Sequence, residues 1–163
     1  MLYNTWTIYG QNRKMKEFLL ERTSRVERPL PEVFDFFASA ENLERLTPPE
    51  LGFQITSRLP IEMRRGALID YTIKLYGIPM KWRTEITQWN PTHSFEDTQL
   101  KGPYAKWVHT HTFTPDGDAT IIHDRVVYGL PLGLLGRIAH PVIAYQLKNI
   151  FNFRESVLAE IFA

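Results

Sequence analysis

Two histidines, His109 and His111, stand two positions apart in a segment where Trp107 and Phe113 share their phase. Because successive side chains of a β-strand point to opposite faces, these four residues are expected on one face of one strand. Imidazoles at this spacing can orient a polar ligand, act as general acid and base, or bind a metal ion. The large aromatic residues beside them indicate that this face is covered.

Three more polar residues share this phase on the neighbouring predicted strands. Asp97 and Gln99 precede the histidines, and Asp124 follows them. If these strands pair as simple hairpins, all five polar side chains point to the same side. A buried polar group without a hydrogen-bond partner is costly, so such a cluster needs partners.

Three interpretations of this polar cluster remain open. It forms a structural network of carboxylates and histidine N–H groups, it orients a ligand inside an apolar pocket, or it carries out catalysis or binds a metal. The third has the least support, because a single His-x-His pair is a weak signal and its aromatic neighbours favour a dry wall. We therefore expect no metal site and no cofactor, and we assign no catalytic residue. The candidates for catalysis are Asp97, His109, His111 and Asp124.

The elements that position these residues follow from hydrophobic periodicity and turn signals. A strand comes first, then two short helices, six strands and a long amphipathic helix. The expected ranges are 16–28 for the first strand, 31–37 and 40–46 for the short helices, and 53–58, 68–76, 80–89, 94–100, 105–114 and 119–128 for the later strands. This order indicates an α+β protein in which the terminal helix covers an antiparallel sheet.

The terminal helix is expected after residue 132, and Pro141 is expected to kink or split it, leaving a short piece over 134–140. Its apolar residues recur at spacings of three, four and seven, which predicts one wide buried stripe. Lys148, Arg154 and Glu155 are expected on its solvated side.

Composition limits the function classes. The 19 Lys and Arg against 18 Asp and Glu give a net charge of +1, which provides no general attraction for nucleic acid. No cysteine is present, and this excludes disulfides, zinc–thiolate sites and iron–sulfur clusters. No apolar segment approaches the roughly 20 residues that cross a bilayer, so we expect a soluble, cytoplasmic protein without stable membrane insertion.

The chain has 163 residues, enough for one ordinary domain. Residues 1–15 fit poorly with the pattern that follows and are expected to be an N-terminal extension, with Met15 as an alternative start. Residues 16–163 are expected to form the domain. The pattern does not indicate an oligomeric state.

Three segments carry a resemblance to a known superfamily. The first is 31–37 (PEVFDFF) running into 41–49 (ENLERLTPP). The second is 95–99 (FEDTQ), continuing through Gly102, Pro103 and Tyr104 to Trp107, His109, His111 and Phe113. The third is 124–128 (DRVVY), followed by Pro131, Gly133 and Gly136. With the element order, these segments resemble the START-like or SRPBCC superfamily, in particular a bacterial subgroup of ligand-binding domains, over about residues 16–162.

The resemblance implies a helix-grip fold, in which a curved antiparallel sheet of about seven strands wraps around the long helix and encloses a hydrophobic cavity. Aromatic residues make up 13% of the chain, which suits either a dense core or a cavity wall. By resemblance, the aromatic residues expected to border the cavity are Phe36, Tyr71, Trp82, Phe95 and Trp107. The polar residues expected to orient a ligand there are Asp97, Gln99, His109, His111 and Asp124.

The expected function is binding of a hydrophobic or amphipathic small molecule, as a carrier or sensor. One alternative is an enzyme of the polyketide cyclase or dehydratase kind that uses the Asp–His cluster as acid and base. Another is an accessory or protein-interaction module with a vestigial cavity. The balance leans away from an enzyme, and the ligand is not identified by the sequence.

Overall fold

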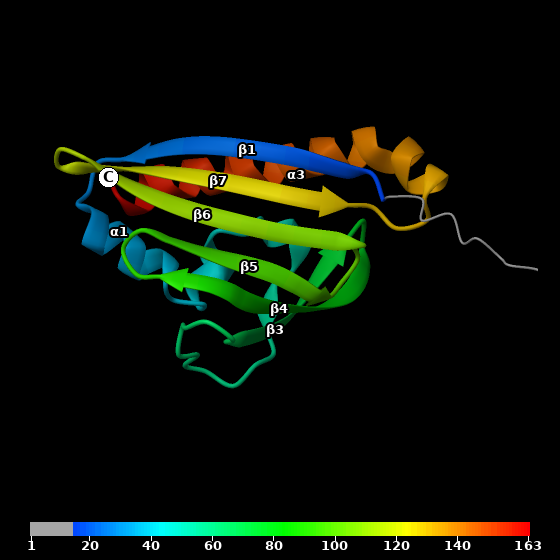
Figure 1. Ribbon diagram of the computed structural model, residues 1–163, viewed down its shortest axis with the longest axis horizontal. Coiled ribbons are helices and arrows are strands. Elements are labelled where there is room, and N and C mark those ends of the chain that lie inside the picture. The colour runs from blue at the N-terminus through cyan, green and yellow to red at the C-terminus, as the bar shows by residue number, and fades with distance from the viewer. Residues whose placement is uncertain (1–14) are drawn as a thin grey trace, which may run out of the picture.

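The computed structural model describes residues 15–163 (Figure 1). Its elements, in chain order, are β1 (Glu17–Val26), α1 (Leu30–Phe37), α2 (Asn42–Arg45), the 3-10 helix η1 (Pro49–Leu51), β2 (Gln54–Ile55), β3 (Leu68–Leu75), β4 (Ile78–Asn90), β5 (Ser94–Lys101), β6 (Lys106–Asp116), β7 (Ala119–Gly129) and α3 (Leu134–Ile161). The predicted order of elements is confirmed. The expected N-terminal extension lies, except for its last residue, outside the described part of the chain.

The seven strands form one antiparallel sheet in the order β1-β7-β6-β5-β4-β3-β2. From β3 to β7, each strand pairs with the strand that follows it, whereas β1 pairs with β7 and places Phe18 opposite Tyr128. In Figure 1 the helix α3 runs behind β1 and β7, along the inner face of the curved sheet. The expected α+β, helix-grip fold is confirmed.

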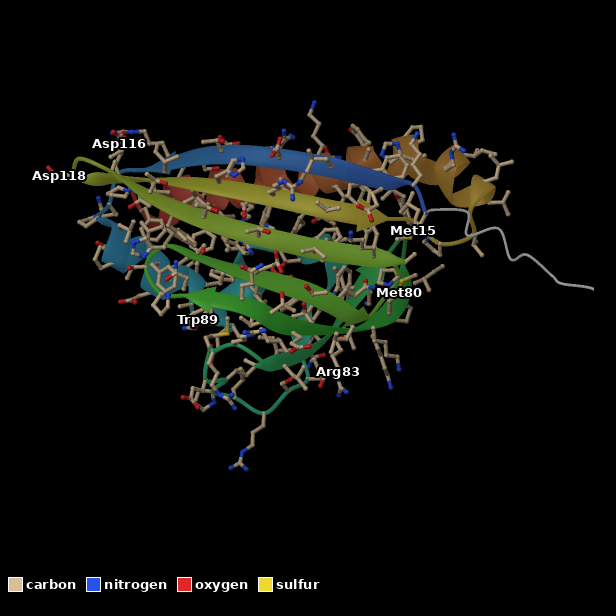
Figure 2. All side chains as sticks on the ribbon, viewed as in Figure 1. Met15, Met80, Arg83, Trp89, Asp116 and Asp118 are labelled. Carbon is tan, nitrogen blue, oxygen red and sulfur yellow. The ribbon has the colours of Figure 1, made fainter. Side chains whose placement is uncertain are left out.

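The two faces of the sheet differ in the way that period-two alternation predicts. In β6 the residues Trp107, His109 and His111 are buried, while the residues between them are only half-buried. On the outer face, Arg83 of β4 donates two hydrogen bonds, of 2.7 and 2.9 Å, to the carboxylate of Asp70 on β3. Figure 2 shows the Arg83 side chain directed away from the body of the molecule. The titratable residues His109 and His111 therefore lie on the inner face of the sheet.

The helix α1 covers one end of the inner face with aromatic side chains. Pro31 lies in its first turn, where the missing N–H group leaves no hydrogen bond unmade. Phe34 and Phe37 are buried in a core cluster that also contains Phe113 of β6 and Leu158 of α3. Side chains from α1, α3 and the sheet pack together at this end of the molecule.

A second core cluster lies under the middle of α3. Leu147 and Phe151 of this helix pack with Trp82, Tyr104 and Trp107 from the sheet side. The first turns of α3, at the other end of the molecule from α1, carry exposed apolar side chains, among them Leu134 and Leu135. In the described residues no helix, α3 included, combines the length and apolar character that crossing a membrane requires.

The expectation that Pro141 splits the terminal helix is wrong, because α3 runs as one helix with Pro141 inside it. A proline within a helix removes one backbone hydrogen bond and frees the carbonyl group four residues before it. That carbonyl belongs to Arg137, which is exposed, so water can satisfy it. The helix therefore continues past the proline.

The second strand is shorter than expected. We predicted a strand over 53–58, but only Gln54 and Ile55 pair with β3. The amide groups of Thr56 and Ser57 both donate to the carbonyl oxygen of Asp70, which ends the regular ladder there. This edge of the sheet is consequently left to a loop.

Candidate functional site

A cavity of about 160 Å³ lies between the inner face of the sheet and the helices that cover it, which are α1, α2 and α3. Its wall is mostly apolar, and it contains all five aromatic residues that were expected to border a cavity. These are Phe36, Tyr71, Trp82, Phe95 and Trp107. The polar residues Asp97, His109 and His111 also line it, so aromatic and titratable side chains share one hollow.

Strand pairing brings the polar residues together. Asp97 on β5 lies opposite His109 on β6, and His111 lies opposite Asp124 on β7. The three strands are neighbours in the sheet, and all four residues point to its inner face. The alternation read from the sequence thus corresponds to one compact cluster.

The distances within this cluster are short. His109 Nε2 hydrogen-bonds Asp124 Oδ1 at 2.9 Å, and His111 Nδ1 lies 2.8 Å from the same oxygen. On the other side, His111 Nε2 hydrogen-bonds Asp97 Oδ2 at 3.2 Å, and His109 Nδ1 lies 3.7 Å from that oxygen. The two imidazole rings are 3.8 Å apart between centroids. Each histidine therefore bridges two carboxylates, with Asp124 behind and Asp97 at the cavity wall.

Arg154 of α3 completes the cluster from the opposite side. Its Nη2 atom lies 3.5 Å from Asp124 Oδ1 and 3.4 Å from His111 Nδ1. Its guanidinium group is also 4.9 Å from the ring centroid of Phe37 and 5.8 Å from that of Phe151. Such a site, between aromatic rings and a carboxylate, suits the flat cation of arginine.

Our expectation that Arg154 lies on the solvated side of the helix is wrong, because only 11% of its side chain is exposed. It is separated from Leu147, Phe151 and Leu158 by seven, three and four positions, which is the spacing of one helix face. That spacing would have placed it inward. The charge of Arg154 suggests solvent, whereas its position on the helix face indicates burial.

Burial and charge act in opposite directions on the two carboxyl groups. Burial opposes ionisation of Asp124, but Arg154 and both histidines outweigh it and hold the pKa of this carboxyl well below its usual range. Burial also opposes ionisation of Asp97, and the hydrogen bond from His111 with the charge of His109 lowers the pKa of that carboxyl. Both groups therefore favour the carboxylate form.

The two histidines are shifted in opposite directions. Burial lowers the pKa of His109, and the charge of neighbouring His111 lowers it further. Burial also disfavours charge on His111, yet its contacts with Asp124 and Asp97 raise its pKa above the ordinary value. Where one proton is available to the pair, His111 is its preferred site.

Gln99, which the sequence placed with the cluster, makes a different contact and is not part of the cavity wall. Its amide donates to the carbonyl oxygen of Tyr104 at 2.7 Å, and its side-chain oxygen accepts from the Tyr104 amide. A Cβ atom at Gly102 would lie 2.3 Å from that side-chain oxygen, so glycine is needed beneath it. Gln99 thus fastens the β5–β6 connection. Asp124 is also absent from the wall and reaches the cavity only through the histidines.

Two buried donors near the cavity have no hydrogen-bond partner among the described residues. They are the indole Nε1 of Trp82 and the Nε of Arg154, and both residues line the cavity. An unsatisfied buried donor costs about 1–3 kcal/mol relative to a satisfied one. The periodic pattern could place Trp82 on the inner face, but it could not show that its N–H group lacks a partner.

Tyr104 and Thr84 also line the cavity and were not expected there. Tyr104 lies in the connection before β6, where period-two alternation does not apply. Thr84 is buried in β4, where its hydroxyl donates to the carbonyl of Thr98 at 3.1 Å and lies 3.4 Å from Asp97 Oδ1. Strand alternation places Thr84 on the inner face with Trp82, but a small side chain gives no separate signal of a cavity wall.

The family model described as polyketide cyclase / dehydrase and lipid transport matches residues 26–152. A sequence search of curated proteins finds no match.

Several solved structures share the fold. An aromatase/cyclase from a Streptomyces species has a TM-score of 0.69 at 14% identity, covering 88% of this chain and 92% of its own. A START superfamily protein from Mycobacterium smegmatis has a TM-score of 0.66 at 13% identity, covering 86% and 96%. A norcoclaurine synthase from Thalictrum flavum has a TM-score of 0.65 at 14% identity, covering 91% and 98%. At these identities the likeness shows the fold alone.

Proposed function

Because this chain belongs to the family of polyketide cyclase, dehydrase and lipid-transport proteins, we propose that it binds a small, largely apolar molecule bearing a hydrogen-bond acceptor. The proposed place is the cavity between the sheet and α3, and the proposed role is that of a carrier or sensor. The family match and the shared fold also confirm the resemblance to the START-like or SRPBCC superfamily.

The observation that carries this proposal is the unpartnered indole N–H of Trp82 in an apolar cavity. The Trp82 ring packs on Tyr71 and Trp107, with centroid distances of 5.6 and 5.5 Å, so the residue is held in place. A ligand oxygen that accepts from Nε1 would remove the cost of the buried donor. Ligand pockets combine apolar walls with a few placed polar groups in this way.

The volume limits the size of the ligand. A cavity of about 160 Å³ is close to the roughly 150 Å³ of an engineered apolar cavity that binds benzene. A molecule of about one aromatic ring with a short polar substituent fits that space. Arg154 Nε provides a second unpartnered donor on the side of the histidines, so the ligand class includes small aromatic ketones and acids.

The test compares two rings that differ in one acceptor. Isothermal titration of the wild-type protein with acetophenone and with ethylbenzene should show about three- to tenfold tighter binding of acetophenone, the value of one hydrogen bond. Trp82→Phe should remove that preference and leave ethylbenzene binding unchanged. The matched control is Trp89→Phe, which changes a tryptophan outside the cavity wall and should keep the preference.

A third variant tests the location. Leu147 is buried on α3 and lines the cavity, so Leu147→Phe places added volume in the hollow and should abolish binding of both rings. If neither ring binds to the wild-type protein, or if Leu147→Phe binds both as well as the wild type does, the proposed site is wrong.

A second candidate function is acid–base catalysis, and the opposite shifts of the two histidines favour it. Two titratable groups whose surroundings push their pKa values apart can supply the base and the acid of one reaction. Here His109 is the neutral imidazole and His111 is the preferred site of the proton. Acetophenone in D₂O gives a direct test, because a base in the cavity would exchange its methyl protons for deuterium. NMR should show exchange faster than in buffer, and His109→Gln should abolish it; exchange at the buffer rate contradicts this candidate alone.

The interaction-module alternative stays a prediction. The exposed apolar side chains at the start of α3, which include Leu134, Leu135, Ile138 and Val142, are the feature that favours it. A cavity whose walls carry unpartnered donors favours ligand binding instead.

A further inference from the structure

We propose that Asp97, His109 and His111 form a binding site for a divalent transition-metal ion, with Asp124 and Arg154 as its outer support. One potential ligand atom from each of these three residues lies within 4.8 Å of the other two. This inference concerns a metal ion and does not depend on the organic ligand proposed above.

Each imidazole has one nitrogen that faces Asp124 and one that faces Asp97. The outer nitrogens, His109 Nε2 and His111 Nδ1, both lie against Asp124 Oδ1, at 2.9 and 2.8 Å. The inner nitrogens, His109 Nδ1 and His111 Nε2, both face Asp97 Oδ2, at 3.7 and 3.2 Å. Metal-binding histidines in proteins commonly donate their second N–H group to a carboxylate, which fixes ring orientation and tautomer. Asp124 stands in that place for both rings at once.

The inner nitrogens of the two histidines share one carboxylate oxygen of Asp97. A proton on His111 Nε2 makes the hydrogen bond to Asp97 Oδ2. With both outer nitrogens donating to Asp124, a metal ion that takes the place of this proton would meet two imidazole lone pairs and one carboxylate oxygen. A zinc ion has bonds of about 2.0 to 2.2 Å to nitrogen and carboxylate oxygen, which places tetrahedral ligand atoms roughly 3.3 Å apart. The two distances to Asp97 Oδ2, 3.2 and 3.7 Å, are close to that separation, and all three ligand atoms lie within 4.8 Å of one another.

The two carboxylates differ in their cationic contacts. Asp124 has a cationic partner in Arg154, at 3.5 Å. Within residues 15–163 no lysine or arginine nitrogen comes within 4.0 Å of the Asp97 carboxylate, whose ion-pair contacts are the two histidines. The carboxylate that a metal would bind is therefore the one that no lysine or arginine among residues 15–163 contacts directly. Thr84, at 3.4 Å from Asp97 Oδ1, helps to orient that carboxylate.

The three proposed ligands can be reached from the cavity. Asp97, His109 and His111 all line the cavity, so a metal held by them would keep a coordination position open to water or to a bound molecule. Two imidazoles, one carboxylate and an open position form the ligand set of catalytic zinc and of mononuclear iron(II) sites. The site accordingly fits a first-row ion such as Zn²⁺, Co²⁺ or Fe²⁺ rather than Ca²⁺ or Mg²⁺, which prefer oxygen ligands.

The test uses the full-length protein, freed of metal by dialysis against a chelator and titrated with Zn²⁺ or Co²⁺ alone. Isothermal titration should give one ion per chain, and bound Co²⁺ should show the intense visible bands of a four- or five-coordinate ion. His109→Gln and His111→Gln should each remove this binding. Asp124→Asn should weaken it by about 10- to 100-fold, as loss of an outer partner does. His123→Gln is the matched control, because it removes a half-exposed imidazole on β7, next to Asp124 in sequence, and should leave binding unchanged.

The wild-type protein provides a measurement that does not depend on any variant folding. The Trp107 ring lies 6.3 Å from that of His109, so paramagnetic Co²⁺ in the site should broaden the Trp107 indole signal in NMR spectra. Absence of stoichiometric binding would overturn the proposal, as would retention of Co²⁺ by both His→Gln variants. Broadening confined to the exposed His93 and the half-exposed His123 would do the same. The titration contains no organic molecule, so its failure would leave the ring-binding proposal untouched.

Discussion

Two regions of the inner face are both rich in aromatic side chains and differ in what covers them. At the α1 end, Phe34 packs edge-on against Phe113 at 5.3 Å and Phe95 at 6.3 Å. Under the middle of α3, Trp82 packs against Trp107 and Tyr104 at 5.5 and 5.6 Å. The ring distances are similar, yet Phe34 and Phe113 lie outside the cavity wall, whereas Trp82, Trp107 and Tyr104 belong to it. Phe95 lies where the two regions meet and lines the cavity.

The difference lies in the helices and not in the sheet. The short α1 packs Phe34 directly against the end of the sheet and fills it there, while Phe36 and Phe37 of the same helix line the cavity. Over the second region α3 contributes Leu147, Phe151 and the polar Arg154, and these leave part of the space empty. An aromatic excess in a sequence therefore indicates a large interior, and the covering helix decides whether that interior is solid.

The largest expected effect compares two buried phenylalanines, one from each region. Phe34→Ala should lower the free energy of unfolding by about 3–5 kcal/mol, as large-to-small changes in a filled core do. Phe151→Ala should cost clearly less, because the Phe151 ring lines the cavity and has fewer neighbours to lose. Urea denaturation with linear extrapolation measures both. Equal losses would mean that the second region is filled in solution.

The next effect concerns the charge network that only the second region contains. Asp124→Asn leaves Arg154 buried without its carboxylate and should cost about 3 kcal/mol at pH 7. The folded-state pKa of Asp124 lies well below its unfolded value of 3.8, so the stabilisation is complete above that value. It is lost as the pH falls through the lower, folded-state pKa.

Urea denaturation of wild type and Asp124→Asn between pH 7 and pH 2 measures this dependence. The difference in free energy of unfolding should stay constant down to about pH 4 and then shrink. A variant as stable as the wild type at pH 7 would show that the network contributes nothing net.

The smallest effect is expected at the cavity wall itself. Trp82→Phe keeps an aromatic ring next to Tyr71 but loses buried ring volume, which destabilises, and removes an unpartnered N–H group, which stabilises. Because these two effects oppose each other, the free energy of unfolding should change by less than about 1 kcal/mol. Thermal unfolding monitored by circular dichroism is a sufficient check. A loss of 2 kcal/mol or more would reveal a partner for the indole and remove the basis of the proposed ligand selectivity.

The fold was predictable because its signals are local. Strand alternation placed His109 and His111 on the inner face, and turn residues separated the strands with small errors at their ends. The second strand was overextended because its end is set by the Asp70 carbonyl on another strand, which periodicity cannot register.

The site was predictable only in part, because its remaining members depend on contacts distant in sequence. Arg154 was missed because its partner, Asp124, lies on β7 and its charge suggested solvent. Gln99 has the phase of the cluster but is diverted by the backbone of Tyr104, a contact that needs the close approach at Gly102. Neither contact leaves a periodic signature in the sequence.

The pairing of the first strand with the last has a consequence for how the protein folds. Arg25 and Asp116, near the ends of β1 and β6, are joined by a hydrogen bond across 91 positions of the chain, and Thr120 of β7 reaches Arg28 across 92. Contacts this distant in sequence slow folding, because a long loop must close before they form. During synthesis β1 must wait for β7, and α3 is made later still. The cavity can therefore form only after nearly the whole chain has left the ribosome, so truncated products should lack it.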